Sequence, residues 1–483
     1  MKEQDNQRFK RRLSPANVWA LAFGCIIGWG SFVNPGKKFL PNSGVAGTAI
    51  AMALGAVVMI IIACSYAYMI PKYPKAGGEF NFTKECFGKN MAFVCGWFLV
   101  AAYLTNVPMN STAIGLIVDG LDGSADILKF GFHYSVAGFE IYFGEMIFAT
   151  AILVLFAYLN MCGVKKAGIV QTILSGLLVT SVFTLAVAAL LSTKATGIHM
   201  EPIWGFDKAS AMAAGATMEN IGDFAHRGSG GILSAVLATF AIAPWAYVGF
   251  DTIPQAAEEF NFSYKKVIGI MVVAILFGCF VYTTNNTVAA AVLANWPEKV
   301  MAGEWVLLVA AEEMLGVFGK VLIGVAVSCA VLSGIMGFYL ASSRLLYSMA
   351  LDGYLPKSFG RIDEKYGTPK NAIIFCMIIS LSGPILGREA LGWFVDMSAI
   401  GASMGFFFTC ASAIRKMNQD RDAGVSLKIM AIAGVVFSAA FMVLQLVPIP
   451  GLAGVHFGRE SYLMLVVWVV LGVIFYGKHA KNR

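Results

Sequence analysis

Charged residues are scarce in this 483-residue chain. Only 13% of its residues are Asp, Glu, Lys or Arg, against about a quarter in soluble domains. Hydrophobic residues make up 58% of the chain, and its mean hydropathy is +0.72. Such a chain has too few charges to cover a water-facing surface, which excludes an ordinary soluble globular domain. The composition indicates an all-α polytopic membrane protein that lies in a lipid bilayer.

The chain also lacks the side-chain groupings that hold metals or perform covalent catalysis. Its nine cysteines include no CxxC pair, and four of its five histidines are scattered in predicted outer loops. No hydrolase elbow, phosphate-binding loop or HExxH motif is present. We therefore expect no disulfide, no metal site and no cofactor.

A cleavable signal peptide is also missing from the start of the sequence. Residues 1–12 are polar and basic, and the apolar run after them is too long for the core of a signal peptide. We expect the first span to be permanent.

Long apolar stretches occupy most of the sequence, and windows of about 20 residues predict some twelve membrane spans. They lie near Asn17–Leu40, Val45–Ile70, Met91–Val118, Gly144–Cys162, Gly168–Leu191, Gly231–Glu259, Val267–Ala294, Val317–Met349, Asn371–Gly387, Leu391–Ile414, Lys428–Val447 and Tyr462–Tyr476. An even number of spans puts both termini on the same side of the membrane.

The basic residues of the predicted loops are distributed unevenly. Of the 35 Lys and Arg residues, 25 fall on the side of the N-terminus and 10 on the other side. Because cytoplasmic loops carry an excess of Lys and Arg, both termini are predicted to be cytoplasmic. The net charge of +7 then follows from membrane topology and requires no nucleic-acid partner.

Two of the apolar runs carry residues that interrupt helices. The first contains Gly24, Gly28 and Gly30, and the sixth contains Pro244, Gly249, Asp251 and Pro254. Inside a bilayer, non-helical backbone is tolerated only where it is buried in protein or lines a cavity. Two interrupted spans about five spans apart are the best sequence indication of a transporter's substrate site. Close helix packing through small residues is the alternative explanation of the three glycines.

Three further segments are distinctive. Asn106 and Asn110 put amides inside the third span, where polar side chains contact a ligand or bridge helices. The aromatic stretch of residues 71–88 predicts a short cytoplasmic helix under the bundle, with a solvated loop as the alternative. Residues 295–315 predict an outer amphipathic helix or lid.

Four segments together carry a family resemblance that covers nearly the whole chain. They are Gly24-Cys25-Ile26-Ile27-Gly28-Trp29-Gly30-Ser31-Phe32, Tyr73-Pro74-Lys75-Ala76-Gly77-Gly78-Glu79-Phe80, Gly249-Phe250-Asp251 with Ala257-Glu258-Glu259, and Ala341-Ser342-Ser343-Arg344-Leu345-Leu346-Tyr347-Ser348-Met349 with Asp352-Gly353-Tyr354-Leu355-Pro356. In this order and spacing, the sequence resembles the amino acid–polyamine–organocation (APC) superfamily of permeases.

The resemblance implies a fold of ten core helices, in which spans one to five recur upside down as spans six to ten (a 5+5 inverted repeat), followed by two accessory helices. Helices 1 and 6 are then discontinuous. The expected division is a cytoplasmic tail at 1–16, the first repeat at 17–193, an outer loop at 194–230, the second repeat at 231–414, and accessory spans with a cytoplasmic tail at 415–483.

The resemblance also implies where the substrate binds. It lies between the two broken spans, flanked by the third and eighth. Backbone N–H groups at the first break suit a carboxylate, and carbonyls with Asp251 at the second suit an ammonium. Trp245 and Phe338 stand where similar permeases carry aromatic gate residues. The alternative is that both side chains only pack against their neighbours or against lipid. The expected substrate-binding residues are Ile27, Gly28, Trp29, Gly30, Ser31, Asn106, Trp245, Tyr247, Gly249, Asp251 and Phe338.

Two departures from the family pattern bear on the substrate and on ion coupling. Trp29 stands where many relatives have a small residue, and Leu178 where proton-linked relatives often carry a lysine. Asp251 is the most central titratable group left, and it either exchanges a proton, holds the substrate's ammonium or caps the second half-helix. The competing mechanism is a sodium ion bound by first-span carbonyls and the hydroxyls of Ser342 and Ser343.

The sequence therefore predicts a secondary active transporter of the cytoplasmic membrane. It would move an amino acid or related amine, coupled to H⁺ or Na⁺ or by exchange, through alternating access and without covalent chemistry. The alternatives are an antiporter of polyamines or organic cations and, from other classes, an ion channel or a membrane-embedded enzyme.

Overall fold

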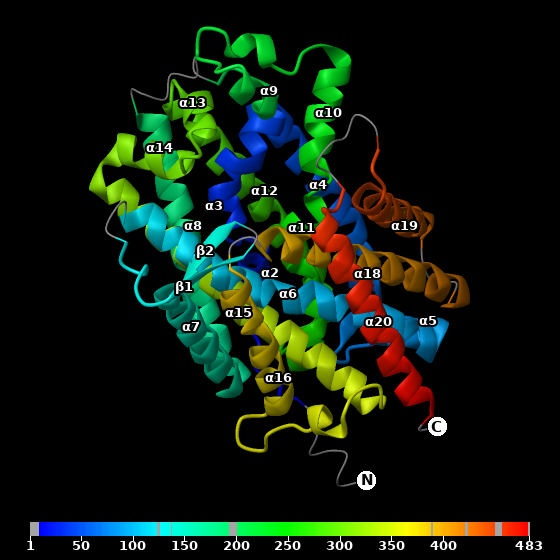
Figure 1. Ribbon diagram of the computed structural model, residues 1–483. Helices are drawn as coiled ribbons and strands as arrows, with labels where there is room; N and C mark the ends of the chain where they lie inside the picture. The colour runs from blue at the N-terminus through cyan, green and yellow to red at the C-terminus, as the bar shows by residue number, and fades with distance from the viewer. Residues whose placement is uncertain are drawn as a thin grey trace.

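The computed structural model describes residues 9–122, 126–136, 138–192, 200–387, 390–420, 424–449 and 456–481, and it is an all-α bundle of membrane-spanning helices (Figure 1). Ten of its helices are long and apolar enough to cross a bilayer, and two shorter apolar segments, Pro15–Ile26 and Lys370–Leu386, accompany them. The polytopic all-α fold predicted from the sequence is confirmed.

The principal helices follow the predicted spans closely. They are α2 (Pro15–Ile26), α3 (Gly30–Asn34), α4 (Leu40–Met69), α6 (Lys89–Asp122), α7 (Phe143–Met161), α8 (Val164–Leu191), α10 (Gly228–Phe240), α11 (Ala243–Ala246), η3 (Phe250–Glu259), α12 (Val267–Val292), α15 (Val317–Leu351), α16 (Lys370–Ser380), α17 (Ser382–Leu386), α18 (Ala390–Asp420), α19 (Val425–Leu446) and α20 (Arg459–Lys481).

Connecting elements complete the described chain. They are the π-helical turn η1 (Pro35–Phe39), α5 (Gly78–Phe87), the hairpin β1 (His133–Val136) and β2 (Phe139–Tyr142), α9 (Lys208–Ala213), η2 (Ile221–Phe224), η4 (Tyr264–Lys266), α13 (Trp296–Met301), α14 (Val306–Leu315) and η5 (Lys357–Gly360). The helix predicted within residues 71–88 is present as α5, and the outer helix or lid at 295–315 is present as α13 and α14. The antiparallel hairpin, which pairs His133 with Tyr142, was not predicted.

Burial separates a central group of helices from peripheral ones. In their most apolar windows, α6 is 78% buried and α15 is 72% buried, whereas α20 is only 11% buried. Figure 1 shows α20 along the outside of the bundle. A chain embedded in lipid leaves apolar side chains on its outer helices unburied. Helices α6, α15 and α18, the last also 72% buried, therefore form the centre that positions the site.

Local sequence signals explain the start of the first span. Ser14 accepts a hydrogen bond from the Asn17 N–H, and the Asn17 side chain in turn accepts one from the Ser14 N–H, which is a capping box. Pro15 occupies the first turn, where its missing N–H costs nothing. The Asn17 amide also donates to the Gly168 carbonyl and the Thr172 hydroxyl, which fixes α2 against α8.

The structure allows a test of the predicted topology. Figure 1 places α9 and α13 at one end of the bundle and the loop between α15 and α16 at the other. If the latter end is cytoplasmic, a cysteine introduced at the exposed Arg361 should stay unmodified by an impermeant thiol reagent in intact cells. A cysteine at the exposed Glu219, in the loop after α9, should be labelled as the matched control. Labelling at Arg361 with protection at Glu219 would invert the topology.

Candidate functional site

The first span is interrupted at residues 27–29. Helix α2 ends at Ile26, Ile27 takes an extended conformation (φ −95°, ψ 96°), and the helix resumes as α3 at Gly30. Within the described residues, the N–H groups of Gly28, Trp29 and Gly30 donate no hydrogen bond. Ser31 stabilises the turn, since its hydroxyl donates to the Gly28 carbonyl at 2.9 Å. The break therefore presents a row of unused backbone donors.

The sixth span is interrupted between α10 and η3. The four-residue helix α11 ends at Ala246, Gly249 has φ +146°, and the chain continues as a 3₁₀ helix from Phe250. The Gly249 N–H donates to Asp251 Oδ1 at 2.7 Å, so the Asp251 side chain bonds back to the residue before η3. In the described part of the chain, no group donates to the carbonyl oxygens of Tyr247 and Val248. This break presents unused acceptors.

The two breaks pack directly against each other. A Cβ added at Gly249 would lie 2.5 Å from the Ile26 nitrogen and 2.7 Å from the Ala22 carbonyl oxygen. On the other side of the break, a Cβ at Gly30 would collide with the Trp245 ring. The rings of Trp29 and Trp245 lie 6.3 Å apart at 55°. Glycine is required at both positions because the neighbouring backbone and indole occupy the space of any side chain.

The third span contributes Asn110 to the first break. The Asn106 amide donates to the Ser398 hydroxyl of α18 at 2.7 Å and to the Ala102 carbonyl at 2.6 Å, so it bridges helices. Asn110, one turn further along α6, has its Oδ1 3.5 Å from the position of a Cβ on Gly28. That buried oxygen has no hydrogen-bond partner among the described residues. Of these two amides, Asn110 is the one aimed at the break.

The remaining expected residues lie around the site at different depths. Phe338 of α15 stacks on Tyr103 with ring centroids 6.4 Å apart. The Tyr247 hydroxyl points away to the Met52 carbonyl of α4, at 2.8 Å. Ser343 accepts a hydrogen bond from Arg344 Nη1 at 3.2 Å, whereas the buried Ser342 hydroxyl has no partner in the described chain. Every expected site residue except the half-buried Gly28 is buried.

Contacts close the site towards both ends of the bundle. On the side of α14, the Trp305 indole N–H donates to the Phe32 carbonyl at 2.7 Å. On the opposite side, Arg344 Nε lies 2.7 Å from Glu259 Oε1, and both side chains are 1% exposed. The N–H groups of Arg12 and Leu13 donate to the Glu259 carbonyl at 2.8 and 2.9 Å, so the segment before α2 is tied to the end of η3. Contacts on both sides of the breaks therefore hold neighbouring elements together in this conformation.

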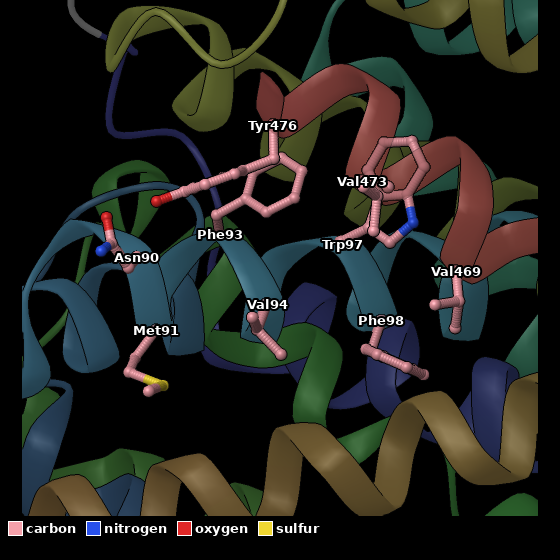
Figure 2. Close-up of a pocket in the computed structure, with 10 residues that line it drawn as sticks. Asn90, Met91, Phe93, Val94, Trp97, Phe98, Val469, Val473 and Tyr476 are labelled. Atoms are coloured by element: carbon pink, nitrogen blue, oxygen red, sulfur yellow. The ribbon is translucent and has the colours of Figure 1, made fainter. Parts of the chain in front are cut away.

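A groove elsewhere on the surface is chemically different. A cavity of about 280 Å³ lies between α6 and α20. Its walls include Phe93, Trp97 and Val473 (Figure 2). Almost all of its lining surface is apolar, and it opens on the lipid-facing side next to α20. A charged solute would find no partners there, so the groove is not the solute site.

Comparisons with known proteins agree with this architecture. A family model described as amino acid permease matches residues 13–474. The branched-chain amino acid permease BcaP of Bacillus subtilis is 24% identical over 486 residues, which cover 98% of this chain and 94% of that protein. The large neutral amino acids transporter small subunit 2 of Homo sapiens is 26% identical over 77% of this chain and 64% of its own length. The vacuolar cationic amino acid transporter 4 of Arabidopsis thaliana is 23% identical over 84% and 63%. The chain thus spans less than two thirds of the plant and human relatives.

The contact between the two breaks predicts a strict requirement for glycine. Gly249→Ala should lower the free energy of unfolding of the purified protein by about 1–3 kcal/mol, and its melting temperature with it. The φ of residue 249 is unfavourable for alanine, and the added Cβ meets backbone. Gly269→Ala in α12, where an added Cβ meets nothing within 4 Å, is the control and should be neutral or slightly stabilising. Equal melting temperatures for both variants would contradict the packing of the breaks.

Proposed function

The chain belongs to the amino acid permease family, and from this premise we propose that it is a secondary active transporter of an amino acid or related amine. It works in the cytoplasmic membrane with both termini in the cytoplasm, and it moves its substrate by alternating access. The fold and the family support the general class, and the two breaks support the kind of substrate.

The observation that carries the proposal is the opposite polarity of the two breaks. Gly28, Trp29 and Gly30 offer unused N–H donors, and the positive end of α3 lies at the same place. Tyr247 and Val248 offer unused carbonyl acceptors on the neighbouring break. A carboxylate suits the donors and an ammonium suits the acceptors. An α-amino acid carries both groups on adjacent atoms, so it satisfies both breaks at once.

The side chain of the substrate would meet aromatic surface. Trp29 and Trp245 stand beside the free backbone groups, and the buried Trp29 indole N–H has no partner among the described residues. Trp245 is placed for a cation–π contact with an ammonium. The relatives named above are described as acting on branched-chain, large neutral and cationic amino acids, so a substrate panel has to include all three classes.

Alternating access requires that the two closures open in turn. Trp305 closes the side of α14, while the Arg344–Glu259 ion pair and the tied residues 12 and 13 close the other side. Because η3 ends at Glu259 and begins beside the substrate site, movement of this half-helix would open the site to the cytoplasm. The break at Gly249 gives it a hinge.

The transport activity can be tested with the purified protein in proteoliposomes. Vesicles loaded with an unlabelled amino acid should accumulate the same labelled amino acid by counterflow, with saturable kinetics. A carrier exchanges the internal substrate for the external one, because it returns to the outer side with internal substrate bound. Polyamines and other organic cations belong in the same panel, since an antiporter of these compounds is the competing function. Non-saturating flux without counterflow would indicate a channel, and chemical conversion of the solute would indicate an enzyme.

Substitutions at the breaks test the binding site. Gly28→Leu should abolish substrate binding because its side chain would fill the space beside Asn110. Gly28→Ala is the matched control, since its Cβ meets nothing closer than Asn110 Oδ1 at 3.5 Å, and it should bind more strongly than Gly28→Leu. Trp245→Ala should weaken binding by about 1–2 kcal/mol, the size of a desolvated cation–π contact. Wild-type affinity in both Gly28→Leu and Trp245→Ala would refute the assigned site.

A further inference from the structure

Two fully buried carboxylates face each other on the inner side of the second break. Glu79 lies in the first turn of α5 and Asp251 in the first turn of η3, and both are 0% exposed. The hydroxyl of Tyr103 stands between them, 3.2 Å from Glu79 Oε1 and 3.1 Å from Asp251 Oδ2. It also lies 3.0 Å from the Asp251 carbonyl oxygen. Four elements meet here, since α4 and α6 contribute the tyrosines that surround Glu79.

The surroundings of the pair contain hydrogen-bond donors but no cation. Tyr66 donates to Glu79 Oε1 at 2.9 Å, and the Gln255 amide donates to Glu79 Oε2 at 2.6 Å. The titratable groups that face the pair are Tyr66 from α4, Tyr103 and Cys95 from α6, and Cys25 from α2. Among the described residues, no Lys, Arg or His contacts either carboxylate. Two ionised carboxylates without a cation would be strongly unfavourable in such a place.

Counting hydrogens shows which protonation state gives both carboxylates a hydrogen bond to Tyr103. Tyr103 has a single hydroxyl hydrogen, so it donates to one carboxylate at a time. If both acids were ionised, the other would face the phenolic oxygen with no hydrogen between them. One additional proton completes the chain, because Glu79 then donates to the Tyr103 oxygen while Tyr103 donates to Asp251. The reverse arrangement, with the proton on Asp251, is equally complete.

We propose that Glu79 and Asp251 share one proton through Tyr103 in this conformation, and that this proton is the ion coupled to substrate movement. The inference rests on the transport function proposed above and adds its coupling ion and a coupling residue, Glu79, that the sequence did not single out. It gives the chain a titratable site in place of the lysine that Leu178 replaces.

The electrostatics of α5, which lies outside the spanning helices, agree with a retained proton. Burial, followed by the charge of Asp251, raises the pKa of Glu79 to about 8. A carboxyl whose pKa is raised in this way stays protonated at neutral pH while the site is closed. Once the surrounding elements separate and water enters, the pKa falls towards its ordinary value and the proton leaves.

The coupling step is balanced in charge and protons. In this conformation the pair holds one proton and a charge of −1. When η3 moves away from α5 and α6, the carboxylates separate, the proton passes to cytoplasmic water, and the pair carries −2. The site then closes towards the cytoplasm and opens to the opposite side of the membrane, where one proton rebinds to the pair before the next substrate is enclosed. One proton crosses for each substrate in this scheme.

The experiment compares pH-driven uptake with exchange in proteoliposomes. Because one proton crosses with each substrate, the ratio of inside to outside substrate in wild-type vesicles should change by up to about tenfold for each pH unit of imposed gradient. Glu79→Gln should reduce this dependence to less than about twofold, while counterflow exchange of the amino acid persists. Tyr103→Phe, which removes the bridging hydroxyl, should also weaken the pH dependence, and Glu79→Asp should restore part of it. Asp396→Asn is the matched control, because this carboxylate of α18 accepts a hydrogen bond from the Ser461 hydroxyl and faces no second acid among the described residues.

A spectroscopic measurement on the purified protein tests the shared proton without a transport assay. At neutral pH the wild type should show the infrared carbonyl band of a buried protonated carboxyl group, and Glu79→Gln and Asp251→Asn should each remove or displace that band. Its absence from the wild type would refute the shared proton. Uptake that follows a sodium gradient, ignores pH and depends on Ser342 would refute proton coupling while the proposed transport function stands. A protein that shows the band but no counterflow would refute the transport function and the coupling role, leaving the shared proton as a structural feature.

Discussion

Backbone hydrogen bonding inside the bilayer is the constraint on which the site depends. Unpaired N–H and C=O groups are costly in lipid, so both broken spans have to place their loose backbone against protein. They do so against each other, since Gly249 lies on the last turn of α2 with no side chain between the two backbone segments. Within the described part of the chain, the donors of one break and the acceptors of the other make no hydrogen bond at this junction. The same glycine that permits the contact also supplies the hinge of η3.

Most of the fold could be predicted because lipid imposes a simple pattern on the sequence. A span needs a long apolar window, and the predicted windows coincide with the helices of the structure to within a few residues at most ends. Elements outside the bilayer follow no such pattern. The hairpin of β1 and β2 lies in a stretch of mixed polarity, and its pairing depends on contacts between strands that hydropathy does not report. The division of the chain into two inverted repeats remains a prediction from the family.

The site was predictable in its backbone and less so in its side chains. The glycines and prolines marked both breaks. Of the glycines, Gly249 has a φ (+146°) that other residues rarely adopt, and Gly30 has no room for a side chain beside Trp245. Asn106 and Asn110 share one face of α6 at a spacing of four residues, so the sequence alone does not say which turn lies level with Gly28. The structure gives that place to Asn110 and pairs Asn106 with Ser398. Glu79 escaped notice because a charged residue in a cytoplasmic loop is ordinarily solvated, and its burial depends on packing against Tyr66, Tyr103 and Gln255.

The half-helix η3 carries an acid at each end, and the two acids have opposite partners. Glu259 at its end pairs with the Arg344 cation, whereas Asp251 at its start faces the acid Glu79. Breaking the first contact opposes opening at every pH, because it would leave a buried charge without its partner. The interaction between Asp251 and Glu79 is attractive or repulsive depending on protonation. A shared proton holds the carboxylates together, and its loss makes them repel in a poorly screened interior. Proton release would therefore offset part of the cost of breaking the ion pair, which ties opening towards the cytoplasm to the protonation state of one half-helix.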